Sequence, residues 1–134
     1  MHSVDSAKVV GRLGSAARAA GRVLTCLVQV SLDAPGSGAG RAGVEGSAVF
    51  ELADTIASAD GLRLGGLMGV APIDEPPEPA FGRLASIWAE LRRAHPDASM
   101  LSAGMSNDFE AAIGAGATHV RVGSAVMGAR PRLG

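Results

Sequence analysis

Two stretches decide the fold of this chain, MLSAGMSNDFEAAI at residues 100–113 and HVRVGS at residues 119–124. They are typical of a strand (98–101), a glycine–serine turn, a helix (107–115), a strand (119–122) and a second glycine–serine turn. Two such turns place backbone N–H groups and hydroxyls at one end of a parallel sheet, where an anion can be held. In a (β/α)8 barrel the phosphate site commonly lies on the last two βα loops. The pattern therefore predicts a site for a phosphate-bearing small molecule, with Arg121 as a cation between the turns.

The rest of the chain alternates apolar strands with amphipathic helices. We expect strands at residues 2–5, 23–32 and 63–70, helices at 8–20, 44–58 and 81–95, a glycine-rich loop at 34–43 and a proline-rich loop at 72–79. Thr25, Gln29 and Ser31 alternate along the second strand, so one of its faces is expected to look into a barrel with polar contents. About five strands and four helices in strict alternation are typical of a parallel α/β fold.

Length limits how much of a barrel can be present. A complete (β/α)8 barrel needs about 250 residues, or about 200 at the short end, and this chain has 134. The sequence therefore predicts an α/β fold that is a partial (β/α)8 TIM barrel, with residues 1–134 forming a portion of a single domain.

Composition excludes several classes of function. The net charge is −1 with mixed signs, so neither a nucleic-acid surface nor a membrane-binding patch is expected. No apolar run reaches the ~18 residues of a membrane span and no signal peptide opens the chain, so a cytoplasmic location is expected. The single Cys26 lies in an apolar strand and is expected to be a buried structural thiol.

Residues 38–43 spell the dinucleotide fingerprint G-x-G-x-x-G. The fingerprint needs its first glycine at the strand end and an acid at the tip of the next strand about 20 residues on. Residues 33–37 intervene here, and the next strand ends at 68–70 without an acid. We therefore interpret this segment as a glycine-rich loop and not as a nucleotide site.

The remaining polar residues predict neither a metal site nor a hydrolase. The three histidines have no metal-ligand spacing. The serines of the two turns lack a nearby His–Asp partner in sequence, so no catalytic triad is expected.

The turn at Ser106 allows two interpretations. In the first, Ser106 or Asn107 is an N-cap, and Asp108 and Glu110 complement the helix dipole, with capping-box spacing from Asn107 to Glu110. In the second, the turn binds a phosphate, although the two acids would weaken anion binding at that helix end.

Arg121 also has two interpretations. Strand alternation places Val120 and Val122 on one face, under the helices, and His119 and Arg121 on the other. A cation that points into a barrel is costly unless it is paired. Arg121 therefore forms either a structural ion pair or part of a ligand site.

The same residues resemble a known family. Leu-Ser-x-Gly-Met-Ser-x-Asp-x-Glu-x-Ala-Ile at residues 101–113, followed by Val-Arg-Val-Gly-Ser, is similar to the C-terminal signature of the YggS-type pyridoxal phosphate (PLP) homeostasis proteins. The similarity extends to GLRLGGLM at 61–68, to Ala71-Pro72 and to HSVDS at 2–6. Those proteins are PLP-binding barrels related to the barrel domain of alanine racemase.

The resemblance implies that the chain is the C-terminal portion of a PLP-binding barrel, about strands 4 to 8. It implies a protein that binds and buffers PLP and hands it on, to PLP-dependent apoenzymes, without a settled turnover reaction and without catalytic residues. It also implies that the phosphate is held by four residues, Ser102, Ser106, Gly123 and Ser124. Arg121 would face the pyridine nitrogen, where a fixed cation disfavours ring protonation and weakens the ring as an electron sink.

Two departures from the family concern the cofactor. Ser31 stands where the family often has Asn. The family's Schiff-base lysine lies on an early strand, upstream of everything here, whereas Lys8 is the only lysine of this chain and is expected to be solvated. The resemblance thus implies a truncated chain or a misplaced start codon at Met1. Two rivals stay open, a TIM-barrel enzyme that acts on a phosphorylated small metabolite and an inactive fragment.

Overall fold

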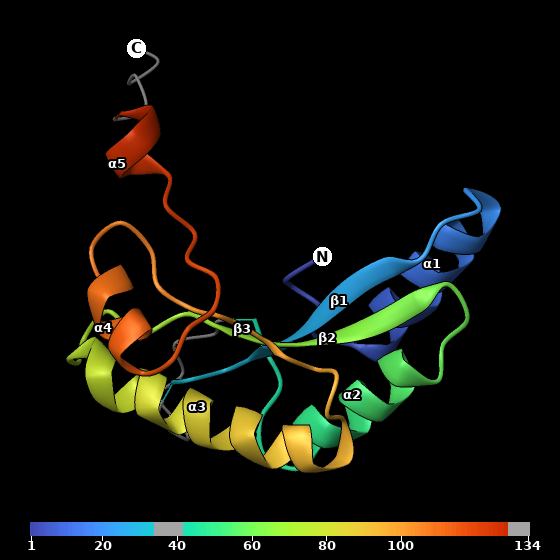
Figure 1. The fold of residues 1–134 in the computed structure, drawn as a ribbon, viewed down its shortest axis with the longest axis horizontal. Helices are drawn as coiled ribbons and strands as arrows, with labels where there is room; N and C mark the ends of the chain where they lie inside the picture. The colour runs from blue at the N-terminus through green and yellow to red at the C-terminus, as the bar shows by residue number, and fades with distance from the viewer. Residues whose placement is uncertain (34–41, 129–134) are drawn as a thin grey trace.

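The computed structural model describes residues 1–33 and 42–128 of the chain (Figure 1). Three parallel strands form one sheet in the order β1-β2-β3: β1 (Leu24–Val30), β2 (Leu62–Gly69) and β3 (Met100–Ser102). The described helices are α1 (Ala7–Ala19), α2 (Ala48–Ala57), α3 (Pro77–Ala94), α4 (Phe109–Gly114) and α5 (Ser124–Met127). The predicted α/β alternation of a partial barrel is therefore confirmed, with parallel pairing throughout the described sheet.

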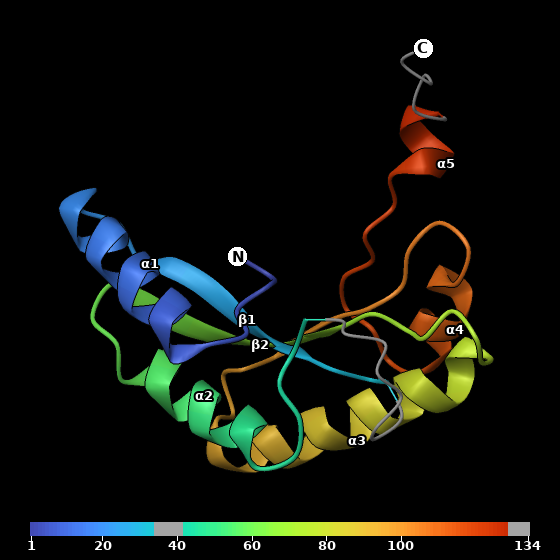
Figure 2. The ribbon, with the colours of Figure 1, turned by 180° about the vertical axis from the view of Figure 1, so that it is seen from behind.

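One face of the sheet carries the hydrophobic core. Alternate residues of β1, Cys26, Val28 and Val30, pack into one cluster with side chains of the helices, among them Leu52 of α2 and Leu84 of α3. Figures 1 and 2 show α2 and α3 lying along this side of the sheet. Cys26 is fully buried, as predicted, and burial raises the pKa of its thiol.

The opposite side, here called the inner face, is lined by Thr25, Leu27, Gln29, Arg63, Met68, Met100 and Ser102. A β-carbon added to Gly65 would lie within 3.1 Å of side-chain atoms of Thr25, Leu27 and Met100, so these three side chains share a face. The Arg63 guanidinium donates to Thr25 Oγ1 at 2.7 Å. Of the polar positions predicted for one side of this strand, Thr25 and Gln29 lie within β1 and each makes a side-chain hydrogen bond, to Arg63 and to the Ala42 carbonyl. Ser31 lies beyond the end of β1.

The two outermost predicted strands are shorter than expected. Residues 2–5 form a single bridge, between Val4 and Val28, and residues 119–122 form another, between His119 and Ser102. Among the described residues, each segment makes this one bridge and does not pair further as a strand. The prediction of five strands is therefore wrong: the described residues form three strands and three isolated bridges, of which these two stand in place of the outermost predicted strands.

Two helix boundaries also differ from the prediction. The helix expected from residue 44 begins at Ala48, because Val44 stays extended and pairs with Val30. The helix expected from residue 81 begins at Pro77, because proline is compatible with the first helical turn, where its missing N–H is not needed. The predicted glycine-rich loop at 34–43 lies outside the described residues except for positions 42 and 43.

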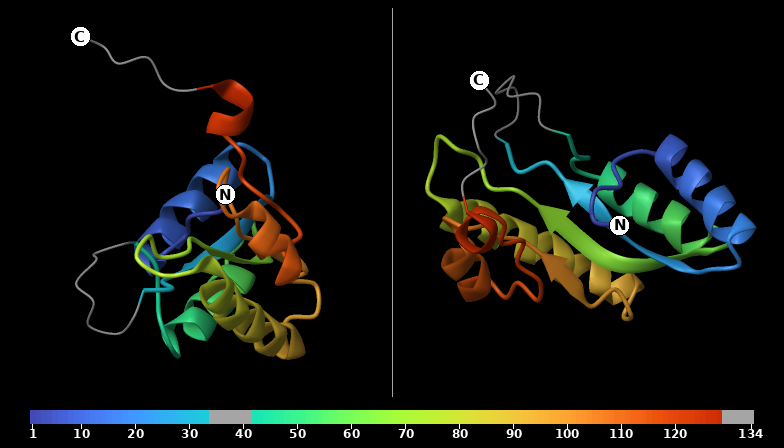
Figure 3. Two further views of the ribbon diagram at one scale, coloured as in Figure 1. Left: turned by 90° about the vertical axis from the view of Figure 1, so that its left-hand side faces the viewer. Right: turned by 90° about the horizontal axis from the view of Figure 1, so that it is seen from above.

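The C-terminal part of the described chain leaves the sheet. Beyond Arg121 it runs away from the strands to α5, which stands apart from the other helices in the view of Figure 1 and in the left-hand view of Figure 3. Val120 is 39% exposed, so the prediction that it lies under a helix is wrong. Over residues 1–33 and 42–128, no helix combines the length and the hydropathy that a membrane span requires.

Candidate functional site

The carboxyl ends of the parallel strands lie at one edge of the sheet, and the two glycine–serine turns meet there. The backbone N–H of Ala125 donates to Ser106 Oγ at 3.3 Å. This contact joins the turn after β3 to the start of α5. The sequence predicted that the two turns would be neighbours, and the structure brings them together.

The first turn depends on Gly104. Its φ is +88°, and an added β-carbon would lie 2.7 Å from Ala112 Cβ and 2.8 Å from Phe109 Cα. A residue with a side chain would therefore be strained and would collide with α4. Glycine at this position lets the chain fold back tightly against the helix that follows.

Asp108 is the N-cap residue of α4, so the prediction that Ser106 or Asn107 fills this place is wrong. The helix starts later than predicted because residues 106–108 form a turn. Asp108 Oδ1 accepts a hydrogen bond from the Met105 N–H at 2.6 Å and closes this turn. A carboxylate therefore already occupies one N–H group that an anion could have used.

Arg121 points to the inner face, as strand alternation predicted. Its Nη1 donates to Ser102 Oγ at 2.8 Å and its Nη2 to the Gly69 carbonyl at 3.1 Å. Both acceptors are neutral, so these contacts orient the guanidinium without neutralising it. Burial lowers the pKa of Arg121, and the nearby Asp108 carboxylate partly opposes this shift.

Ser102 is fully buried beneath Arg121. Its Oγ is also 2.9 Å from Nδ1 of His2, which reaches the inner face from the other end of the chain. The His2 ring meets the His119 ring edge to face, with centroids 6.1 Å apart. Burial lowers the pKa of His2, and the positive charges of the amino terminus, His119 and Arg121 lower it further.

The second turn is more open. Gly123 is exposed, and its carbonyl accepts the N–H groups of Val126 and Met127 at 3.0 and 2.8 Å as α5 begins. Ser124 is the first residue of that short helix. Of the five predicted site residues, Ser102 and Arg121 are thus in direct contact, and Ser106 contacts the residue that follows Ser124.

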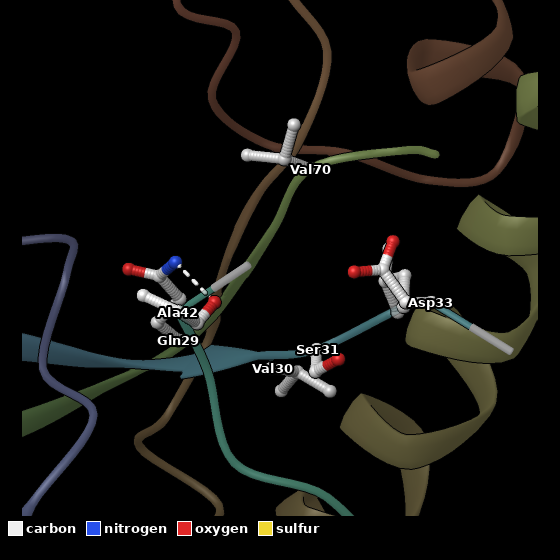
Figure 4. Close-up of a pocket in the computed structure, with 7 residues that line it drawn as sticks. Gln29, Val30, Ser31, Asp33, Ala42 and Val70 are labelled. Carbon is white, nitrogen blue, oxygen red and sulfur yellow. Dashed lines mark hydrogen bonds between the residues drawn. The ribbon is translucent and has the colours of Figure 1, made fainter. Parts of the chain in front are cut away.

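Among the cavities of the described structure, two bear on residues discussed for the ligand site. One, of about 370 Å3, lies between the loop after β2 and the Ser106 turn and is lined by Ala71, Pro72, Ile73, Glu75, Pro77, Met105, Ser106, Asn107 and Asp108. The other, of about 220 Å3, lies at the carboxyl end of β1 and includes Ser31 (Figure 4). There Gln29 Nε2 donates to the Ala42 carbonyl at 2.6 Å, so the amide is already engaged. The first cavity lies within the usual size range of ligand pockets, about 300–1,000 Å3, and the second is below it.

Comparisons with known proteins show the family. The family described as "Alanine racemase, N-terminal domain" matches residues 1–131. The chain belongs to this family. Within it, the chain is a member of the YggS/PipY group of pyridoxal phosphate homeostasis proteins, which confirms the resemblance found in the sequence.

Two curated relatives carry the description "Pyridoxal phosphate homeostasis protein". The one from Mycobacterium tuberculosis (strain H37Rv) is 44% identical over 135 residues, which cover 96% of this chain and 52% of the relative. The one from Corynebacterium glutamicum is 41% identical over 139 residues, covering 98% of this chain and 61% of the relative. The chain therefore spans about half the length of the curated relatives it matches.

The solved structure of PipY from Synechococcus elongatus PCC7942 with PLP bound has a similar fold. It superposes with a TM-score of 0.78 and 29% identity, covering 92% of this chain and 57% of PipY. PLP is the ligand of that protein.

The lysines of the chain bear on how it could hold PLP, because a lysine amine can form a Schiff base with this cofactor. Lys8 is the only lysine among the 134 residues, and it is exposed on α1, as predicted.

Among residues 1–33 and 42–128, no three His, Cys, Asp or Glu side chains gather as they would around a metal ion.

Sequence reasoning did not select His2 as a site residue, although the structure places it against Ser102. Alternation gives no signal for His2, because residues two apart along a strand share a face and Val4 packs in the hydrophobic core on the other side of the sheet. What the alternation could not reveal is that the first and last segments approach each other across the inner face.

Proposed function

We propose that this chain provides the phosphate-facing and pyridine-facing part of a PLP site, as the C-terminal portion (strands 4 to 8) of a barrel that binds and buffers PLP. The observation that carries the proposal is the Arg121 guanidinium, fixed on the inner face by Ser102 and the Gly69 carbonyl. A half-buried cation held by neutral acceptors is suited to meet a ligand group that carries a lone pair or a negative charge. In the whole protein, PLP-dependent apoenzymes would receive the cofactor.

The phosphate would lie between the two turns. Ser106, Gly123 and Ser124 come from loops that touch through the Ser106–Ala125 hydrogen bond, and the cavity beside Ser106 offers space. Ser102 would contribute through Arg121, because its hydroxyl is buried and already accepts from that guanidinium. The Asp108 carboxylate opposes an anion here, so phosphate must displace or outweigh its bond to Met105.

Arg121 would determine what the bound cofactor can do. PLP supplies a pyridine ring that acts as an electron sink when its nitrogen is protonated. A fixed cation beside that nitrogen disfavours its protonation. The chain's own contribution is therefore to hold the ring in a poorly reactive form, which suits a carrier that protects and releases its ligand.

The same loops could serve an enzyme that acts on another phosphorylated metabolite, and ligand competition separates the two. The chain would be equilibrated by dialysis with PLP, with pyridoxal, which lacks the phosphate, and with inorganic phosphate. We expect PLP to be retained more tightly than either of the others, and Arg121→Gln to weaken this retention. The matched control Arg93→Gln removes an exposed arginine of α3 and should have no effect. Equal retention of PLP and inorganic phosphate, or retention that is insensitive to Arg121→Gln, would reject the proposal.

A further inference from the structure

The Ser102 hydroxyl lies between two side chains from opposite ends of the chain. His2 Nδ1 is 2.9 Å from Ser102 Oγ across 100 residues of sequence, and Arg121 Nη1 is 2.8 Å from the same oxygen. Ser102 is fully buried. Its hydrogen-bonding capacity must therefore be satisfied inside the protein, because an unsatisfied buried polar group is costly.

The direction of these hydrogen bonds follows from the chemistry of the three groups. A guanidinium can only donate, so Ser102 Oγ accepts from Arg121. The single hydroxyl hydrogen of Ser102 is then available to His2 Nδ1, which accepts it only when that nitrogen carries no proton. A continuous series from Arg121 through Ser102 to His2 thus requires neutral His2 with its proton on Nε2.

The surroundings of His2 favour the same state. The charged groups that face its ring are the amino terminus of the chain, His119 and Arg121, all positive when protonated. Together with burial they disfavour a further positive charge on His2. The electrostatics and the hydrogen-bond geometry therefore agree.

Arg121 has its second anchor on the neighbouring strand. Its Nη2 donates to the carbonyl of Gly69, the last residue of β2, while Ser102 is the last residue of β3. Two acceptors on adjacent strands fix both the position and the plane of the guanidinium. Without the Ser102 contact, the group would keep a single anchor and could rotate about it.

We propose that Ser102 and His2 are positioning residues for Arg121, with Ser102 anchoring the guanidinium and neutral His2 setting the direction of the Ser102 hydroxyl. The consequence for the ligand rests on the proposed function, in which Arg121 faces the pyridine ring. Protonation of His2 would put an N–H donor against the Ser102 hydroxyl and leave the serine hydrogen without its acceptor. The anchor should therefore weaken in acid.

The first experiment needs no ligand. Long-range ¹H–¹⁵N NMR spectra of the chain with labelled histidine report the tautomer and the titration of each ring. We expect His2 to be neutral with its proton on Nε2, and to titrate at lower pH than a free histidine. In Ser102→Ala the loss of the hydroxyl donor should shift His2 toward the tautomer mixture of free histidine, whereas the control Ser99→Ala, an exposed serine just before β3, should leave it unchanged. A proton on Nδ1 in the unmodified chain, or a free-histidine mixture there, overturns the proposal.

The second experiment measures PLP retention in matched variants. His2→Asn keeps an acceptor oxygen near the place of Nδ1 and should retain PLP, whereas His2→Phe keeps the ring shape without an acceptor and should weaken it, roughly 2- to 10-fold for one lost hydrogen bond. If both variants fold and retain PLP equally, the proposed role of His2 is overturned. If the unmodified chain retains no PLP, the proposed function fails for this chain, while the NMR result still decides whether the positioning contacts exist.

Discussion

The backbone N–H of Ala125 donates to the hydroxyl of Ser106 at 3.3 Å, and this bond joins two turns through residues that are 19 apart in the sequence. At that length it is a weak hydrogen bond. A phosphate that accepts from both groups would form stronger, charge-assisted bonds than the one it replaces. A bound phosphate could therefore replace this hydrogen bond with its own bonds to the Ala125 N–H and the Ser106 hydroxyl, at little cost in free energy.

Replacing Ser106 should weaken the retention of PLP in the whole protein. Ser106→Ala removes a donor to a charged phosphate, a contact worth about 1.5–3 kcal/mol. Retention of pyridoxal, which has no phosphate, should change little. The ratio of the two dissociation constants measures the effect, with Ser86→Ala on the exposed side of α3 as the control. A ratio that stays the same in Ser106→Ala would remove this residue from the phosphate site.

Replacing Arg121 should act by a different route. In the whole protein, Arg121→Ala takes away the cation that disfavours protonation of the pyridine nitrogen, so the ring becomes a stronger electron sink. We expect a shifted absorbance spectrum of bound PLP and faster transamination side reactions with added amino acids. Arg93→Ala should reproduce the unmodified spectrum. If the spectrum and the side reactions of Arg121→Ala match the unmodified protein, Arg121 does not face the ring.

Much of the fold could be predicted from local patterns, because the apolar periodicity of each element reflects the face it buries. Helix α1, predicted at residues 8–20, ends where Gly21 adopts a positive φ of 62°. Strand β2 was predicted at 63–70 and forms one residue earlier. One boundary that failed depends on tertiary pairing: Val44 leaves its predicted helix because Val30 offers it a parallel bridge. The starts of α3 and α4 failed for local reasons, the proline of the first helical turn and the turn that Asp108 closes.

The candidate site was predictable only in part for a similar reason. The alternation of residues along one predicted strand was enough to predict that Arg121 points to the inner face. The partners of its guanidinium, Ser102 and the Gly69 carbonyl, come from two other strands, and His2 comes from the opposite end of the chain. A local sequence pattern does not show which distant segments meet in space. The contact between His2 and Ser102, 100 residues apart, could therefore be found only in the folded structure.

The chain by itself should not form a Schiff base with PLP at a specific site. Its only lysine, Lys8, is exposed on α1, so no lysine side chain near the inner face can supply the amine. The amine that does lie there, the α-amino group of Met1, already donates to the Thr25 carbonyl at 2.8 Å. Mixing the chain with PLP and recording the visible spectrum tests this. A stoichiometric new band that survives Lys8→Ala would mean that the α-amino group of Met1 reacts, and a band that Lys8→Ala abolishes would mean that this lysine does react. Either result contradicts the prediction.

Gly104→Ala should destabilise the chain, whereas Gly82→Ala should not. Gly104 has a φ of +88° and its added β-carbon would press against Ala112 and Phe109. Left-handed strain and overpacking together predict a loss of at least about 2 kcal/mol in the free energy of unfolding. Gly82 lies within α3, and a β-carbon there meets no atom within 4 Å. Alanine at that position should stabilise the helix by about 0.5–1 kcal/mol. Urea denaturation of both variants measures the difference, and similar midpoints would show that the turn at Gly104 does not depend on glycine.

The stability of the chain should fall as the pH drops below the usual pKa of histidine, about 6.5. His2 has a lowered pKa in the folded state, so below that pH the unfolded chain binds a proton that the folded chain resists. Stability is lost wherever the unfolded state binds more protons, and the loss ends once the pH passes below the lowered pKa of folded His2. Urea midpoints measured between pH 7.5 and pH 4.5 would follow this change. His2→Asn, which cannot titrate, should flatten that part of the curve, whereas substitution of the partly exposed His95 by Asn should leave the His2 contribution in place. A pH dependence that is the same in His2→Asn and in the unmodified chain would contradict the assignment of the effect to His2.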